Sequence, residues 1–381
     1  MSSSKSRARS HSDYRAAFNR TTAGSVFVKE STPRNRPALV YLVTEDWYFL
    51  SHRIPMAQAA QRAGYDVHVI TQANKDRRAI EALGIHVHAI AWQRGSFNPF
   101  KFLANVRAIR QLYREVAPDL VHHVALQPTV AGSLAAAGLP FARLNAIAGF
   151  GFSFTSTTLR ARLARPVLQA LMRYVLGHSR STVLVQNPHD LTAVERLGVP
   201  KEKIRIIRGS GVDIRKLVPL PVPEGPLTAA FVGRLLDDKG VRTLVEAHKI
   251  LRERGQDVRL LIAGEPDPAN PASIPPKEIA AWTRQPGVEV LGHVADISSV
   301  WRSAHIAVLP SRREGLPKSL LEAAACGRPI VATDVPGCRE IARDGINALL
   351  VPPDRPGALA DAIARLAGDE GLRRRFGEAG R

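Results

Sequence analysis

The sequence predicts an α/β protein with mostly parallel sheets, on three observations. Apolar runs of strand length alternate with helix-length stretches along most of the chain. Residues 305–337 show the unit plainly: an apolar run from Ile306 to Leu309, a loop, a helix that Pro317 can begin and Gly327 can end, and a second apolar run. This order predicts a strand, a crossover helix and a second strand. A proline-rich segment, residues 219–226, divides the chain into two such halves.

Length and composition bound the class of protein. The chain has 381 residues, of which 45% are hydrophobic and 23% charged, as in a soluble protein with two domains. Its two cysteines, Cys326 and Cys338, are too few for a disulfide framework and lack metal-ligand spacing, so we expect a reducing cytoplasm. The expected parts are a disordered basic tail (1–36), a first domain (37–218), a linker (219–226) and a second domain (227–381).

The net charge of +19 predicts attraction to a polyanion. Nucleic acid, an anionic membrane surface and an anionic substrate are the three candidates. The chain shows no nucleic-acid-binding motif and only 6% of its residues are aromatic, which argues against nucleic acid. Residues 159–180 carry five arginines among apolar residues at helical spacing, with Pro166 as a break or a fresh start. Such a helix either lies on an anionic bilayer or packs in the fold with a solvated rim.

The first half reads as a Rossmann-like sequence of elements. We expect strands at Ala38–Thr44, Val67–Thr71, Val87–Ile90, Leu120–Val124, Thr182–Gln186 and Ile204–Ile207, and helices over about 51–63, 101–116 and 159–180. His122 and His123 are neighbours on one of these strands. Adjacent strand residues point to opposite faces, so at most one of the two faces a given cleft, and both cannot bind one metal ion.

The second half places charged residues in two loops. After a strand at Thr228–Val232, Gly233 allows a close turn, while Arg234 and Lys239 can bring two cations to one anion at the start of a helix. The alternative is a solvated charged loop. The loop 312–316 enters its helix at the carboxyl end of a strand, where open α/β sheets bind ligands and the helix dipole favours an anion.

Two glutamates, Glu314 and Glu322, do not suit an anion site by charge. They make sense if they accept hydrogen bonds from neutral hydroxyl groups, and a sugar nucleotide carries hydroxyls on both sides of its diphosphate. The alternative is a solvated loop residue and a surface helix residue.

These residues carry a resemblance to a known family. Glu314, seven intervening residues and Glu322 stand within Pro-Ser-x-x-Glu-Gly-Leu-Pro and Leu-Leu-Glu-Ala-x-Ala-x-Gly-x-Pro-Ile-Val-Ala-Thr, which resembles the signature of family 4 retaining glycosyltransferases of GT-B architecture. The upstream Gly-Arg…Lys-Gly segment resembles the diphosphate clamp of that family. Residues 146–155 are similar to a segment of bacterial members that extend polyprenyl-diphosphate-linked glycans. The resemblance covers nearly all of residues 38–381.

The resemblance implies two facing Rossmann-like domains, with the donor bound by the second and the acceptor by the first. It implies that the two clamp cations neutralise the leaving diphosphate together with backbone N–H groups, that Glu314 holds donor-sugar hydroxyls and that Glu322 holds the ribose diol. A histidine of the pair His122 and His123 would lie near the donor sugar, or both are structural. The expected catalytic residues are Arg234, Lys239, Glu314, His122 and His123, and the expected donor-binding residues are Gly233, Gly315, Leu316, Pro317 and Glu322.

On the acceptor side, the family's glycine-rich loop after the first strand is replaced by bulky residues. The expected acceptor-side residues are Asp46, Trp47, His52 and Asn145; loop packing and a solvated helix cap are the alternative for the first three.

The implied reaction moves a hexose or N-acetylhexosamine from a sugar nucleotide, expected to be UDP-linked, to a lipid-linked glycan acceptor in surface polysaccharide or glycoconjugate synthesis. No metal ion and no cofactor is expected, because protein cations replace the ion. The expected location is cytoplasmic and peripheral, at the anionic inner face of the cell membrane, with no nucleic acid as partner. The alternatives are a nucleotide-sugar epimerase of the same architecture and a non-catalytic binding protein.

Overall fold

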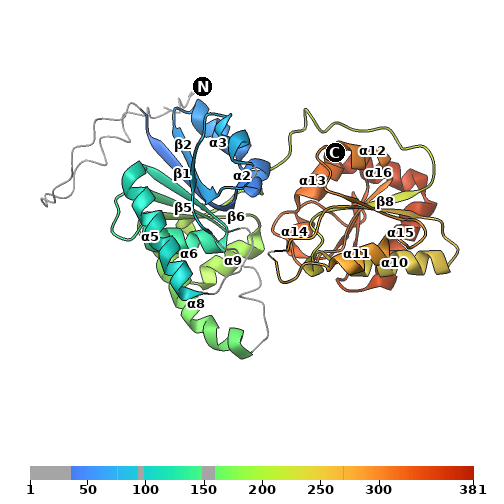
Figure 1. The fold of residues 1–381 in the computed structure, drawn as a ribbon. Helices are drawn as coiled ribbons and strands as arrows, with labels where there is room; N and C mark the ends of the chain where they lie inside the picture. The colour runs from blue at the N-terminus through green and yellow to red at the C-terminus, as the bar shows by residue number, and fades with distance from the viewer. Residues whose placement is uncertain (1–35, 75, 93–97, 148–158, 269) are drawn as a thin grey trace, which may run out of the picture. The chain divides into compact units, whose positions relative to one another are not determined.

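The computed structural model describes residues 36–74, 76–92, 98–147, 159–268 and 270–381, and it contains two parallel sheets (Figure 1). The first has the strand order β3-β2-β1-β4-β5-β6-β7 and the second the order β10-β9-β8-β11-β12-β13. Every pair of neighbouring strands is parallel. The predicted α/β class with parallel sheets is confirmed. Nearly all of the predicted basic tail and most of the segment 146–155 lie outside the described residues.

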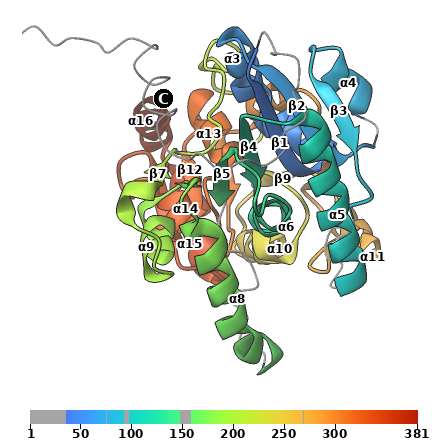
Figure 2. The ribbon, with the colours of Figure 1, turned by 90° about the vertical axis from the view of Figure 1, so that its left-hand side faces the viewer.

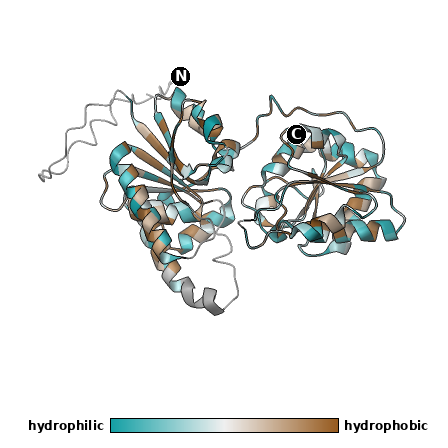
Figure 3. Ribbon diagram, in the orientation of Figure 1, coloured by the Kyte–Doolittle hydropathy of each residue, from teal (hydrophilic) through white to brown (hydrophobic). Residues whose placement is uncertain are grey.

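The strands of the first sheet are β1 (Ala38–Glu45), β2 (Asp66–Gln72), β3 (His86–Ala89), β4 (Leu120–Val124), β5 (Ala142–Ile147), β6 (Ser181–Val185) and β7 (Ile204–Ile206). Those of the second are β8 (Thr228–Val232), β9 (Arg259–Ala263), β10 (Val288–Gly292), β11 (Ile306–Leu309), β12 (Ile330–Thr333) and β13 (Ala348–Val351). Their residues are mostly hydrophobic, whereas the helices carry both hydrophilic and hydrophobic residues (Figure 3), as expected for sheets covered on both faces.

The first sheet is covered by α2 (Asp46–His52), α3 (Ile54–Arg62), α4 (Arg77–Glu81), α5 (Pro99–Val116), α6 (Leu126–Ala135), α8 (Leu159–Gly177) and α9 (Pro188–Arg196). Alternate residues of β1 belong to different cores: Leu39 and Tyr41 pack with α2 and α3, whereas Val40 and Leu42 pack with α5. Figure 2 shows α5 beside α6, which it contacts.

The second sheet is covered by α10 (Val241–Glu253), α11 (Pro276–Trp282), α12 (Ile297–Ser303), α13 (Lys318–Ala325), α14 (Pro336–Arg339), α15 (Pro356–Gly368) and α16 (Glu370–Gly380). One continuous apolar core fills both faces of this sheet. Short 3₁₀ turns occur at Lys201–Lys203 and Asp237–Lys239.

Three helices differ from prediction. The helix predicted over about 51–63 is two helices, because Pro55, which lacks an N–H group, sits in the first turn of α3 and starts it anew. The helix predicted from about residue 101 begins at Pro99, where the Asn98 side chain accepts hydrogen bonds from the N–H groups of Phe100 and Lys101. The predicted break at Pro166 is wrong: α8 runs through it, and its second half packs on the core.

Both sheets have a topological switch point, where the strand order reverses. It lies between β1 and β4 in the first sheet and between β8 and β11 in the second. Crevices at the carboxyl ends of such strands are the usual ligand sites of open α/β sheets. Ligand sites are therefore expected in the loops that follow these four strands.

Among the described residues, no helix combines the length and the apolar character that crossing a membrane requires.

Candidate active site

The loops after β8 and β11 are packed against each other. Gly240 ends the first loop at φ +69°, and a Cβ atom added to it would lie 2.0 Å from the carbonyl oxygen of Pro310, so only glycine permits this approach. The N–H of Arg312 donates to the carbonyl of Asp238 at 2.8 Å. Two loops distant in sequence thus form one surface at the switch point.

Ion pairs brace the same two loops. Arg312 pairs with Asp237 at 2.5 Å and also with Asp354, and Arg313 pairs with Asp238 at 2.5 Å. Sequence reasoning missed these aspartates, because Asp237 and Asp238 stand 75 positions from their arginines and Asp354 stands 42 from Arg312, so no local spacing links them. They position the residues that follow.

Arg234 points from the first loop and is held by an acid that the sequence analysis did not identify. Its Nη1 donates to Oδ2 of Asp267 at 2.7 Å, and its side chain is 37% exposed. Its guanidinium carbon lies 5.9 Å from the centre of the Trp47 ring, within the range of a cation–π contact. Gly233 beside it is approached closely: a Cβ added to Gly264 would lie 1.8 Å from the Gly233 carbonyl oxygen.

Lys239 and Glu314, both predicted site residues, form an ion pair of 2.5 Å between Nζ and Oε1. The side chains are 23% and 8% exposed. Neither is a solvated surface charge. The loop carrying the predicted clamp cations therefore meets the loop carrying the predicted sugar-binding carboxylate.

Backbone donors lie next to this pair. Within the described part of the chain, the N–H groups of Gly315 and Leu316 have no hydrogen-bond partner, whereas the Gly315 carbonyl accepts from Asn187 at 3.1 Å. Helix α13 begins at Lys318, with Pro317 in the N-cap position rather than in the predicted first helical position. Unpaired N–H groups before a helix favour an anionic ligand.

Glu322 lies on α13 and is not a surface residue: it is 8% exposed. Burial raises the pKa of its carboxyl group, and Lys318, whose Nζ lies 3.4 Å from Oε1, opposes that shift. Lys318 is a further residue that the sequence analysis missed, although its i, i+4 spacing to Glu322 is a readable signal. A buried carboxylate with one cationic neighbour retains acceptor capacity for hydroxyl groups.

On the first sheet, Asp46 is buried and organises a loop. Its Oδ2 accepts hydrogen bonds from the backbone N–H groups of Asn74 at 2.6 Å and Asp76 at 3.2 Å. These hydrogen bonds give the Asp46 carboxylate a structural role in the loop. Its predicted role in binding the acceptor substrate stays a prediction. Trp47 and His52 are half-buried. Burial, with Lys318 and Arg53 nearby, lowers the pKa of His52 to about 4, so its imidazole is neutral at neutral pH.

His122 and His123 point to opposite faces of β4, and both are buried. His123 lies in a hydrogen-bonded network: Nδ1 is 2.7 Å from Oδ1 of Asn145, and Nε2 is 2.9 Å from the Tyr113 hydroxyl oxygen. Asn145 also donates to Ser181 at 2.7 Å. The structural alternative thus explains His123, and the buried Asn145 is a partner within the same network. Their roles toward donor and acceptor stay predictions.

Arg53 is a polar group that the sequence analysis missed. It is 5% exposed, and among the described residues its side chain has no hydrogen-bond or ion-pair partner. It lines a small pocket with Met56, Gln186 and Gly209, at the carboxyl ends of β5 and β6. A buried arginine without a partner is costly unless a ligand supplies an anion. A lone arginine before a proline-containing helix gives no such signal in sequence.

The chain matches two family models. Residues 38–187 match the family described as "Glycosyl transferase 4-like", and residues 226–369 match "Glycosyl transferases group 1". Together the two matches cover most of the described chain: the first contains strands β1 to β6 of the first sheet, and the second contains all strands of the second sheet.

The chain is also similar to individual glycosyltransferases and to solved structures. The N,N'-diacetylbacillosaminyl-diphospho-undecaprenol alpha-1,3-N-acetylgalactosaminyltransferase of Campylobacter jejuni is 27% identical over 349 residues, which are 85% of this chain and 90% of that protein. The sucrose-phosphate synthase of Thermosynechococcus elongatus has a similar structure, with a TM-score of 0.74 and 19% identity over 91% of this chain and 93% of that one. Anabaena Alr3699/HepE, solved in complex with UDP, gives a TM-score of 0.71 at 18% identity, over 90% and 93% of the two chains.

Proposed function

Since the chain belongs to the group 1 glycosyltransferases, in the retaining family 4 with the GT-B fold, we propose that it moves a hexose or N-acetylhexosamine from a UDP-linked sugar to a lipid-linked glycan acceptor. The observation that carries the proposal is the Lys239–Glu314 pair at the switch point of the second sheet, beside Arg234 and the unpaired N–H groups of Gly315 and Leu316.

The donor's diphosphate would bind where these cations and N–H groups meet. As the bond between the sugar and the diphosphate breaks, negative charge grows on the departing phosphate, and Arg234 and Lys239 would stabilise it electrostatically. The backbone N–H groups of Gly315 and Leu316 would add two donors that need no reorganisation. Glu314 would accept hydrogen bonds from sugar hydroxyls, and the buried Glu322 would accept from the ribose diol. The complex of Alr3699/HepE with UDP supports UDP as the nucleotide.

The acceptor would be a glycan on a lipid diphosphate. The name of the Campylobacter jejuni relative gives it a diphospho-undecaprenol acceptor. In this chain, Arg53 is a buried cation whose side chain has no partner among the residues that the structure describes. It lies next to Met56, which suits an acidic group that carries an apolar chain. Trp47 and His52 would lie on the acceptor side of the same crevice.

A membrane surface is the place where such an acceptor resides. The net charge of +19, the arginines of α8 and two exposed aromatic rings, Tyr174 at 64% and Phe100 at 81%, support reversible docking on an anionic bilayer. We therefore propose peripheral attachment to the cytoplasmic face of the cell membrane.

The test is a transfer assay in which a panel of sugar nucleotides is offered with a polyprenyl-diphosphate-linked acceptor. The expected result is one preferred UDP-sugar and a product lengthened by one residue with the anomeric configuration retained. Turnover that interconverts the donor sugar without acceptor would instead show an epimerase. Tight donor binding with neither reaction would show a non-catalytic binding protein.

A further inference from the structure

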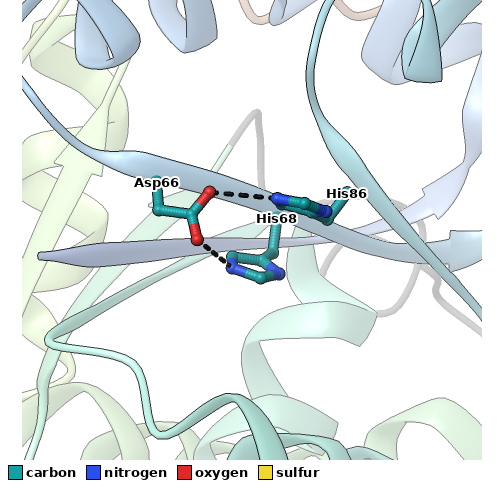
Figure 4. Close-up of side chains that lie close together, drawn as sticks. All are labelled: Asp66, His68 and His86. Atoms are coloured by element: carbon teal, nitrogen blue, oxygen red, sulfur yellow. Dashed lines mark hydrogen bonds and ion pairs between the residues drawn. The ribbon is translucent and has the colours of Figure 1, made fainter. Parts of the chain in front are cut away.

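Three histidines and an aspartate gather on one face of the first sheet, away from the site described above. Asp66 and His68 lie on β2, and His86 and His88 lie on β3. The strands are parallel with His68 opposite His86, and residues two apart share a face, so all four side chains point to one side. Figure 4 shows Asp66, His68 and His86 converging.

The potential ligand atoms are close together. The two carboxylate oxygens of Asp66 each lie 3.2 Å from an imidazole Nε2, one of His68 and one of His86. All three ligand atoms lie within 4.8 Å of one another. Around a tetrahedral zinc ion with bonds of about 2.0–2.1 Å, ligand atoms stand roughly 3.4 Å apart. Small side-chain rotations would therefore admit an ion.

His88 supplies the second contact that a histidine ligand requires. Nδ1 of His68 lies 3.0 Å from Nε2 of His88, and the His68 ring is stacked against both other rings. If His68 binds a metal ion through Nε2, its Nδ1–H donates to His88. That bond sets the tautomer and the ring orientation, as is usual around metal-binding histidines. His68 is also 8% exposed, so its ring is held by packing.

We propose that Asp66, His68 and His86 bind one divalent transition-metal ion of the zinc class. Two imidazoles and one carboxylate suit zinc, cobalt or nickel, whereas magnesium and calcium prefer oxygen ligands throughout. The side chains of His86 and Asp66 are 60% and 38% exposed, so water can complete the coordination and the ion can enter from solvent.

The position of the cluster separates this ion from sugar transfer. Asp66 and His86 begin their strands, whereas the loops of the candidate active site follow the carboxyl ends of strands. The ion would join β3, the edge strand of the sheet, to β2. Because the site exists only when these strands are paired, binding stabilises the folded chain in proportion to the logarithm of metal concentration.

The experiment uses the full chain, purified without a polyhistidine tag and freed of metal with a chelator that is then removed. Zinc is titrated against a chromophoric chelator, cobalt is titrated while its visible absorption is recorded, and the melting temperature is followed. We expect one zinc ion per chain, a cobalt spectrum of low coordination number, and a melting temperature higher by roughly 5 °C at about 100 times the dissociation constant.

Variants assign the ligands. His86→Ala, at an exposed position, should weaken zinc binding at least tenfold and remove the cobalt spectrum, and Asp66→Asn should act alike. His88→Ala should weaken binding about 10- to 100-fold with the stoichiometry kept. His293→Ala removes an exposed histidine elsewhere and should change nothing. Absence of stoichiometric zinc in the parent chain, or equal affinity in His86→Ala and His293→Ala, would overturn the proposal.

Discussion

The Nζ atom of Lys239 lies 2.5 Å from Oε1 of Glu314, although 75 positions separate the two residues. The contact exists because Gly240 lets one loop lie directly against Pro310 of the other. It holds the ammonium group of Lys239 and the carboxylate of Glu314 next to each other at the proposed donor site. On donor binding, Lys239 would turn to the diphosphate and Glu314 to the sugar.

Removing either clamp cation should slow transfer. We expect Arg234→Ala and Lys239→Ala each to delete a charge-assisted contact of about 1.5–3 kcal/mol, which lowers donor turnover roughly tenfold or more. Initial rates with saturating acceptor measure the effect. Arg259→Ala, which breaks an exposed ion pair with Glu289, is the matched control and should keep the parent rate. Parent rates in well-folded Arg234 and Lys239 variants would contradict the clamp.

The two glutamates should separate binding from chemistry. Glu322→Gln should weaken affinity for the free nucleotide, because a carboxylate that accepts from the ribose diol is replaced by an amide. Glu314→Gln should leave nucleotide affinity nearly unchanged and lower the transfer rate instead. Calorimetry with UDP measures the first effect and single-turnover assays the second. An unchanged UDP affinity in Glu322→Gln would show that Glu322 does not hold the ribose.

The sequence predicted the alternation of strands and helices, because periodicity and proline or glycine signals are local. It also led to the prediction of Arg234, Lys239, Glu314 and Glu322 as site residues, through the resemblance of their segments to a family motif, and their roles stay predictions. It did not reveal Asp267 or Arg53, because the environment of each depends on tertiary neighbours. The adjacent positions of His122 and His123 in the sequence also did not show that His123 is buried against Tyr113 and Asn145. That burial depends on the packing of α5 on the sheet.

Buried histidines should make the fold sensitive to acid. Burial lowers the pKa of His123 to about 4, against 6.5 when exposed, so the unfolded chain binds the proton more readily. Its contribution to stability is complete above pH 6.5 and is lost as the pH falls toward 4, with a slope approaching about 1.4 kcal/mol per pH unit. Urea unfolding at a series of pH values measures this slope. His123→Asn should lower the slope by up to this amount without abolishing it, because burial also lowers the pKa of His122. An identical slope in the variant would exclude His123 as a source.

Transfer should survive EDTA. The candidate active site would offer cations and backbone N–H groups to the diphosphate, so we expect that no metal ion is required there. We expect unchanged initial rates after incubation with excess EDTA, even though the histidine cluster on β2 and β3 would lose its ion and the chain some thermal stability. A rate that falls with EDTA and returns with magnesium would contradict the metal-free clamp.

The attachment to membranes should be electrostatic. Each basic residue near an anionic bilayer contributes about 1 kcal/mol to binding, so a few arginines on one helix suffice for reversible docking. At physiological salt the attraction is largely screened beyond about 8 Å. Helix α8 spans Leu159–Gly177 and carries Arg160, Arg162 and Arg165 in its first two turns. In a flotation assay, the protein should rise with anionic liposomes at low salt and be released at about 0.5 M salt.

Two triple variants with the same change in net charge, one in α8 and one on the second sheet, test whether α8 makes this attachment. Replacing Arg160, Arg162 and Arg165 by Glu should abolish flotation and leave hydrolysis of the donor intact, because the proposed donor site lies on the second sheet. Replacing the exposed Arg252, Lys277 and Arg284 by Glu changes the net charge by the same amount on helices and loops of the second sheet, and it should preserve flotation. If both triple variants lose flotation equally, the total charge and not α8 is responsible. Equal flotation of the parent protein with neutral and anionic liposomes would instead favour an apolar attachment through rings such as Tyr174.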